Sequence, residues 1–462
     1  MIVHPMDIGL VVGVLSSTLA LWIGGGRYRR VTIATLVVAT ATVTAHILTA
    51  EIRWQVVSMH LAGAIVAVAA VADLARETPR RRSLVSLLAL VATIAGAAAV
   101  WSLPVTQISA PHGAYSVGRQ AFTVVDDARE ERWGPAPGGP RRIAVTVWYP
   151  AHAGYVGTPS PWIGDADDVI GAVAERLRLP EFTLGHLRTV TTAAADDAPV
   201  SADAPFPMVI FSHGWSGATF LHTDQLVELA SHGYVVVGID HTYAALASVL
   251  DDHVAVLDVT SLPADPDDDE FVAAGALIST FSADVERVFS AVTGQLAISD
   301  IIDPTRIALT GHSTGGGAAI MTCSRVRWCD AVVGADPWVE PLPDDLVGDG
   351  LDVPLLSIRS EEWTDTDNDA RLRRLHAASR GSEGRISIAG SQHQDFTLVP
   401  AVVRAGEVLG MHGPNADDTH VLAVDWTRRF LDHHLRGIGT DPLDAPTADA
   451  RVTVSRTPPD AP

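Results

Sequence analysis

The chain contains no lysine, and all 32 of its basic residues are arginine. We interpret the missing lysine as compositional bias. Positive charge is also scarce overall, because 54 acidic residues give a formal net charge of -22. Residues 1–107 hold eight arginines and four acids, so the acidic excess lies in the remaining part. Binding to phosphate backbones relies on clustered basic side chains, and this composition argues against nucleic acid as a partner.

Cysteine is nearly absent as well, with Cys323 and Cys329 the two present. A separation of six residues is not a zinc-binding pattern without further Cys or His ligands, so no metal site is expected here. Two alternatives stay open for the pair, namely two small buried side chains or a disulfide bond. The disulfide is favoured if this region lies outside the cytoplasm.

Long apolar runs are abundant where charge is missing, at residues 6–24, 31–50, 54–72 and 83–103. Each has about 20 residues, the length a helix needs to cross the hydrocarbon layer. A cleaved signal peptide would be the alternative for the first run, but residues 1–7 carry no positive charge and three similar runs follow. We therefore predict a four-span membrane domain over residues 1–107. Its embedded polar residues are interpreted as helix-packing groups, not as a functional site: His46, Gln55 and His60.

The loops between these runs differ in charge. Arginine is frequent in the first and third loops, whereas the middle loop has one acid and one arginine, Glu51 and Arg53. The arginines of the first and third loops are Arg27, Arg29, Arg30, Arg76, Arg80, Arg81 and Arg82. Positively charged loops stay in the cytoplasm, so both termini and the whole second domain are expected on the extracytoplasmic side.

A linker at residues 104–119 leads into a second domain, residues 108–462, in which strand and helix patterns alternate. Continuous apolar strands between helices imply a mostly parallel sheet covered on both faces, the α/β-hydrolase architecture, with about eight strands. The expected strands are residues 120–125, 143–149, 207–211, 234–239, 307–309, 331–334, 353–358 and 385–388. Helices are expected at residues 221–231, 281–296 and 419–435, besides one directly after residue 315.

Two acidic segments, residues 154–200 and 250–278, interrupt this alternation and are expected to be lids or surface excursions. The second contains the run Asp-Pro-Asp-Asp-Asp-Glu at residues 265–270. That run lacks the glycine and ligand spacing of an EF-hand, so we predict a solvated loop without calcium.

The strongest chemical motif is Gly-His-Ser-Thr-Gly, centred on Ser313. A strand pattern precedes it and a helix of small residues follows, which is the context of the nucleophile elbow of serine hydrolases. Glycine on both sides of the serine is needed because a Cβ there would collide with the neighbouring strand and helix. The motif predicts Ser313 as a catalytic nucleophile.

A serine nucleophile needs a base and an orienting acid, and in this fold the chain order is Ser, acid, His. Asp336 ends the strand after the elbow helix, while Glu361 and Glu362 end the next strand and remain rivals for the acid. His393 follows the last predicted strand and is the expected base. Four other histidines compete less well because they lie further from the strand end or late in the last helix: His412, His420, His433 and His434.

An oxyanion hole usually uses two backbone N–H groups, one after the nucleophile and one in the loop after an earlier strand. Thr314 would supply the first. Trp215 would supply the second, in the Phe-Ser-His-Gly-Trp stretch of residues 211–215. His213 is expected to shape this loop and not to act as a base.

Several motifs in the same order resemble the platelet-activating factor acetylhydrolase family, the lipoprotein-associated phospholipase A2 group with its bacterial relatives. They are residues 111–118 (PHGAYSVG), 147–150 (VWYP), 211–214 (FSHG), 231–234 (SHGY) with 240–241 (DH), 311–313 (GHS), 336–338 (DPW) with 341–342 (PL), and 391–396 (SQHQDF).

The resemblance implies a triad of Ser313, Asp336 and His393 that needs neither metal nor cofactor, with Asp336 as the acid. It further implies hydrolysis of lipid esters with short or oxidised acyl chains. The chain departs from the family at Thr314, where a bulkier apolar residue is usual, at Trp215, where a smaller one is usual, and in its four N-terminal spans. Two alternatives remain, a polyester or cutin-type esterase and a catalytically silent binding module.

Overall fold

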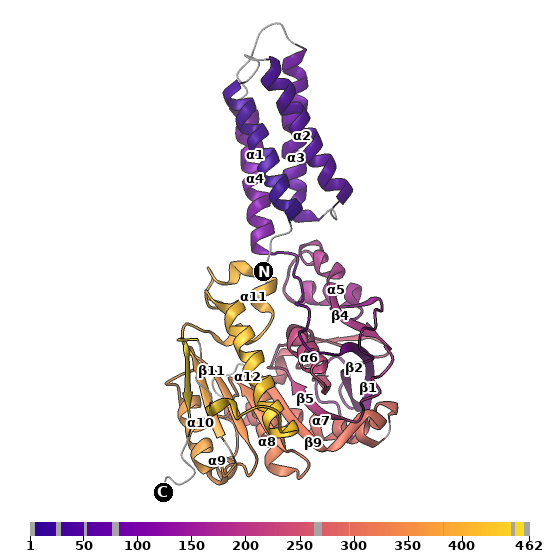
Figure 1. The fold of residues 1–462 in the computed structure, drawn as a ribbon, viewed down its shortest axis with the longest axis vertical. Coiled ribbons are helices and arrows are strands. Elements are labelled where there is room, and N and C mark those ends of the chain that lie inside the picture. The colour runs from indigo at the N-terminus through magenta and orange to yellow at the C-terminus, as the bar shows by residue number, and fades with distance from the viewer. Residues whose placement is uncertain are drawn as a thin grey trace. The chain divides into compact units, whose positions relative to one another are not determined.

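The computed structural model describes residues 5–24, 29–49, 53–75, 83–262, 270–294, 296–381, 383–444 and 449–456. The chain forms two compact units (Figure 1). The first contains Met1–Gln107 together with Pro180–Leu187 and Ala401–Leu409, and the second contains Ile108–Leu179, Arg188–Pro400 and Gly410–Pro462. The longest segment of the first unit ends at Gln107. The two short segments that belong with the N-terminal helices were not expected.

The first unit is built from four long helices: α1 (Pro5–Gly24), α2 (Arg29–Thr49), α3 (Trp54–Leu74) and α4 (Ser83–Ser102). All four are long and apolar enough to cross a membrane, as the sequence predicted. Their bounds agree with the apolar runs to within two residues. The loop arginines Arg27, Arg76 and Arg80–Arg82, and also Glu51, lie outside the described residues.

Charged and polar side chains join three of these helices at one end of the bundle. The guanidinium of Arg53 donates to both carboxylate oxygens of Asp7 at 2.7 and 2.8 Å. His46 Nε2 lies 3.0 Å from the same carboxylate, and His60 Nε2 lies 3.1 Å from His46 Nδ1. Asp7 and His46 are each 2% exposed. The chain of contacts links α1, α2 and α3, in agreement with a packing role for the embedded histidines.

Replacing Asp7 with alanine should destabilise this bundle, because Arg53 would keep a buried charge without its partner. The expected loss is about 3–5 kcal/mol, as for other broken buried pairs. Thermal unfolding of the full chain in detergent measures it. Ser16→Ala is the matched control on α1, since the Ser16 hydroxyl bonds only to its own helix. Equal stability of the two variants would contradict the role of the ion pair.

The second unit is organised on a sheet of eleven strands in the order β13-β12-β11-β10-β9-β5-β6-β2-β1-β4-β3. Strands β5, β6 and β9 to β12 are parallel, whereas β1, β2 and β13 run antiparallel to their hairpin or edge neighbours. The eight expected strands are all present: β1 (Ser116–Glu130), β2 (Pro140–Ala151), β5 (Phe206–Ser212), β6 (Val235–Asp240), β9 (Ile302–His312), β10 (Ala331–Ala335), β11 (Leu355–Ser360) and β12 (Glu383–Ile388). Three further strands extend the edges: β3 (Pro159–Pro161), β4 (Thr191–Asp196) and β13 (Val452–Ser455).

Helices cover both faces of this sheet, as expected for parallel strands. Alternate residues of β5 divide between two cores, with Met208 and Ile210 in one and Val209 and Phe211 in the other. The first core includes α7 (Glu270–Gly294) and α8 (Thr314–Arg325), and the second includes α6 (Thr223–Ser231) and α12 (Ala416–Arg436). The structure therefore confirms the α/β-hydrolase class. Shorter helices are α5 (Ala166–Arg176), α9 (Asp344–Asp349), α10 (Asp367–Ala378) and α11 (Val399–Val402).

The two acidic segments are more ordered than expected. The first contributes α5 and the strand β4, which pairs in parallel with β1. The second contains β8 (Val254–Val256), which pairs with β7 (Ala247–Val249) just before the segment, and α7 begins at Glu270, eleven residues before the predicted helix start. The small residues of β4 give a weak strand pattern, which explains why it was missed. Residues 265–269 of the acidic run lie outside the described residues.

The two cysteines are joined by a disulfide bond, with their Cα atoms 5.4 Å apart. Cys323 lies in the last turns of α8 and Cys329 lies shortly before β10. This decides between the two alternatives that the sequence left open.

Candidate active site

Ser313 lies at the turn between β9 and α8, where the backbone is strained. Its φ is 55° and its ψ is -122°, which is a conformation that non-glycine residues seldom adopt. A Cβ on Gly315 would lie 2.1 Å from the Ser212 carbonyl oxygen, and one on Gly311 would lie 2.4 Å from the Gly315 backbone. Both glycines therefore permit a close approach of strand and helix that no other residue allows.

The end of β10 and the residues just after it hold the backbone of the serine by two hydrogen bonds. Its N–H donates to the Ala335 carbonyl at 3.0 Å, and its carbonyl accepts from the Trp338 N–H at 2.9 Å. The loop after β5 also comes close, since a Cβ on Gly214 would lie 2.9 Å from Ser313 Cβ. The predicted nucleophile and the predicted oxyanion loop are thus in van der Waals contact.

The imidazole of His393 contacts Asp336, the acid that follows β10. His393 Nδ1 lies 3.1 Å from Asp336 Oδ2, and the other carboxylate oxygen accepts from the Ser360 N–H at 2.9 Å. Burial alone would raise the pKa of Asp336, but the hydrogen bond and charge of His393, with Arg359 and Ser360, lower this pKa below its ordinary value. Asp336 is therefore an ionised acceptor, and the proton between the two side chains belongs to His393 Nδ1.

The rival acids bind the backbone of the same loop and not the imidazole. Glu362 accepts from the His393 N–H at 2.7 Å, and Glu361 accepts from the Gly390 N–H. These contacts position the loop that carries His393. Asp336 is the carboxylate that contacts its ring.

Two other rings stack on His393. The Trp363 ring is parallel to it, with centroids 4.1 Å apart and an interplanar angle of 2°, and the His312 ring lies at 4.4 Å and 32°. His312 Nε2 also lies 3.1 Å from the His393 carbonyl oxygen. Burial, followed by the nearby His393, lowers the pKa of His312 to about 3, so its ring stays neutral. Neither of these ring contacts was expected from the sequence.

Within the described residues, the structure records no hydrogen bond between Ser313 and His393. Both side chains are partly exposed at the same edge of the sheet. Catalytic hydrogen bonds are often long before substrate binds and shorten only in the reacting complex.

The loop after β5 is held by His213, which is completely buried. Its Nε2 accepts from the His241 N–H at 3.1 Å, so the neutral ring carries its proton on Nδ1, 2.7 Å from the Gly214 carbonyl oxygen. Burial lowers the pKa of His213, which keeps the ring neutral. Trp215 follows, and its N–H donates to the hydroxyl oxygen of Thr314 at 3.3 Å. The two predicted oxyanion residues are therefore in direct contact.

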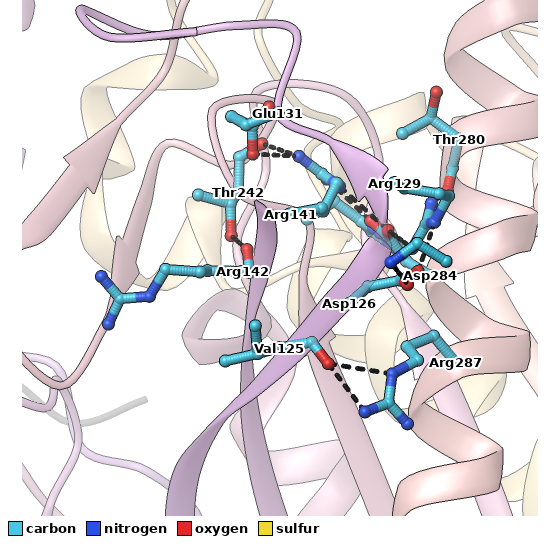
Figure 2. Close-up of polar contacts among 12 residues, drawn as sticks. Val125, Asp126, Arg129, Glu131, Arg141, Arg142, Thr242, Thr280, Asp284 and Arg287 are labelled. Carbon is cyan, nitrogen blue, oxygen red and sulfur yellow. Dashed lines mark hydrogen bonds and ion pairs between the residues drawn. The ribbon is translucent and has the colours of Figure 1, made fainter. Parts of the chain in front are cut away.

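A buried ionic network around Asp284 is drawn in Figure 2, and His241 connects it to the loop after β5. The Asp284 carboxylate on α7 accepts two hydrogen bonds from the guanidinium of Arg141 on β2, at 2.7 and 2.9 Å. It accepts a third from Arg129 at 2.7 Å. The same carboxylate lies 3.0 Å from His241 Nδ1, while His241 Nε2 lies 3.1 Å from Ser212 Oγ. The network thus connects helix α7 and the hairpin β1–β2 to the residues that precede Gly214.

The remaining histidines have other partners. His412 Nδ1 lies 3.2 Å from the Gly413 carbonyl, and His420 pairs with Asp224 at 2.8 Å. His433 and His434 lie with Asp441 in the one group of described residues whose ligand atoms could meet at a metal ion, but Asp441 is already paired with Arg456. No predicted catalytic residue belongs to that group.

Buried neutral histidines make the fold sensitive to acid. Burial lowers the pKa of His241 to about 3, below its ordinary 6.5, so the unfolded chain binds a proton that the folded chain excludes. The free energy of unfolding should therefore decrease as the pH is lowered from 6.5 to 3, by about 1.4 kcal/mol per pH unit for this one group.

His241→Asn keeps a donor toward Asp284 and removes the titrating ring. Its melting temperature should depend less steeply on pH than that of the wild type between pH 6 and 4.5. Parallel profiles of the two proteins would show that His241 does not titrate on unfolding.

Comparison with known proteins finds one family model and several related esterases that match this chain. The family model described as platelet-activating factor acetylhydrolase, isoform II, matches residues 102–258 and 282–435. Platelet-activating factor acetylhydrolase of Gallus gallus is 26% identical over 54% of this chain and 67% of its own length. The corresponding protein of Canis lupus familiaris is 24% identical over 54% of this chain and 61% of its own length.

Among solved structures, a ferulic acid esterase from Streptomyces cinnamoneus superposes with a TM-score of 0.65 and 25% sequence identity. The superposition covers 76% of this chain and 99% of the esterase. The esterase therefore shares the fold of most of this chain.

Proposed function

The chain belongs to the platelet-activating factor acetylhydrolase isoform II family, and we propose that it is a membrane-anchored serine esterase acting on lipid esters with short or oxidised acyl chains. The observation that carries the proposal is the contact between the His393 imidazole and the ionised Asp336, beside a serine in a strained elbow. Such a set of residues serves acyl transfer.

In the proposed reaction, Asp336 holds the proton of His393 on Nδ1, which leaves Nε2 free to accept the Ser313 proton. Ser313 Oγ attacks the ester carbonyl, and the backbone N–H groups of Trp215 and Thr314 stabilise the tetrahedral oxyanion. His393 then protonates the leaving alcohol. Water attacks the acyl-enzyme with His393 as base, and the acid is released from Ser313.

The neighbours of His393 suit this cycle. The ring becomes a cation when it takes the serine proton, and the face of Trp363 against it stabilises that cation. His312 stays neutral on account of its lowered pKa, so it adds no repulsive charge.

The four helices support a lipid substrate, because they hold the enzyme at a bilayer. An extracytoplasmic catalytic domain is proposed from the arginines of the first and third loops. The Cys323–Cys329 disulfide supports this orientation, since disulfides persist in oxidising compartments. The likeness to a ferulic acid esterase favours a second candidate, an esterase for phenolic or polymeric esters on the same machinery.

Ser313→Ala should lower turnover of p-nitrophenyl butyrate by about 10⁴–10⁶-fold in the full chain, because loss of the nucleophile removes the acyl-enzyme route. Asp336→Asn should also lose most activity, while Glu361→Gln should retain it. Ser324→Ala on helix α8 is the matched control, since its hydroxyl bonds only to the Met321 carbonyl. Wild-type rates in Ser313→Ala would refute the proposal.

Phospholipid vesicles with short acyl chains, feruloyl esters and polyester films, supplied in parallel, separate the two candidate substrate classes.

Alkaline phosphatase fused after the C-terminus should be active in cells, because the enzyme matures only outside the cytoplasm. A fusion at Thr78, in the arginine-rich third loop, should be inactive. The opposite pair of results would reverse the proposed orientation.

A further inference from the structure

The elbow carries a second hydroxyl besides that of Ser313, on the neighbouring residue Thr314. Thr314 is the first residue of α8 and is 1% exposed. Its oxygen accepts the Trp215 N–H at 3.3 Å. The hydroxyl of one proposed oxyanion-hole residue, Thr314, is therefore bonded to the backbone N–H of the other, Trp215.

The Thr314 hydroxyl is recorded as an acceptor and not as a donor. A hydroxyl offers one donor and two acceptor positions, and the Trp215 N–H occupies one acceptor. Threonine in a helix usually donates to a carbonyl three or four residues earlier. The described residues include no recorded acceptor for the Thr314 hydroxyl, and the carbonyls of Thr310 and Gly311 are not among its partners. A buried donor without an acceptor costs free energy unless a ligand supplies one.

The oxyanion of the tetrahedral intermediate is an acceptor of the required kind in the required place. We propose that the Thr314 hydroxyl is a third donor of the oxyanion hole. This inference rests on the proposed function. Before substrate binds, the hydroxyl oxygen accepts a hydrogen bond from the Trp215 N–H. When the carbonyl oxygen enters, it accepts that N–H, and the hydroxyl rotates to direct its proton at the same oxygen.

The exchange is favourable in the transition state because the new acceptor carries a full negative charge. Charge-assisted hydrogen bonds are about twice as strong as neutral ones, so one neutral bond is exchanged for two stronger bonds. In the ground state the carbonyl is neutral and this gain is absent. The effect should therefore appear in kcat and leave KM nearly unchanged.

Thr314→Val, which keeps the shape and removes the hydroxyl, tests the proposal in the full chain. It should lower kcat for p-nitrophenyl butyrate by about 10²-fold, at the lower end of the loss seen on removing one oxyanion donor. Thr314→Ser should restore most of the rate because it keeps the hydroxyl. Thr314→Ala serves as a second hydroxyl-free variant if valine disturbs the packing, and melting temperatures check that each variant folds.

Inhibition by butylboronic acid gives an independent readout, since its tetrahedral adduct with a serine places a negative oxygen in the hole. Thr314→Val should weaken this inhibition much more than it changes KM, and Thr314→Ser should not. A Thr314→Val enzyme as active as the wild type would overturn the proposal. The hydroxyl would then only accept the Trp215 N–H in the free enzyme. Failure of the proposed function is distinguishable, because Ser313→Ala would then be as active as the wild type.

Discussion

The site depends on one steric constraint, the close approach of the β5 loop to the turn between β9 and α8. Gly315 lies against the Ser212 carbonyl, and Gly214 lies against the Ser313 side chain, at separations where any Cβ would collide. This contact brings the serine and the Trp215 N–H to the same edge of the sheet. Strain at Ser313 is tolerated because the hydrogen bonds from Trp338 and to Ala335 hold the turn in place. Preorganisation of this kind lets an oxyanion form without moving the protein.

Electrostatics then separates the roles of the buried titratable groups. Asp336 stays ionised through its pKa, which His393 and Arg359 lower, while burial keeps His213, His241 and His312 neutral. Neutral rings can orient loops through hydrogen bonds without repelling the cation that is proposed to form on His393. Asp284 is likewise a buried ionised group near the loop after β5, and Arg141 and Arg129 compensate its negative charge. Charge is thus present where the proposed chemistry uses it and is paired elsewhere.

Sequence periodicity and motif order predicted the four spans, the eight principal strands and the fold class, because each is encoded in local patterns. The elbow glycines were also understood in advance, since their steric role depends only on the turn. Trp363, His312 and the Thr314 hydroxyl acquire their roles from contacts across more than 20 residues of chain, and a linear pattern carries no record of such contacts. Strand β4 was missed for a different reason, because its alanines lack the apolar alternation of a half-buried strand.

The four N-terminal helices form one compact unit together with two short segments from later in the chain, Pro180–Leu187 and Ala401–Leu409. Trp54 at the start of α3 donates its indole N–H to the Thr183 carbonyl and packs edge to face on Phe182, and Thr106 donates to the Ala401 carbonyl. Removal of residues 1–107 would leave Pro180–Leu187 and Ala401–Leu409 without these partners. Both segments belong to the same polypeptide as the loops of the site. The full chain is consequently the form in which these two segments retain their contacts, and it is the form in which the proposed activity should be tested.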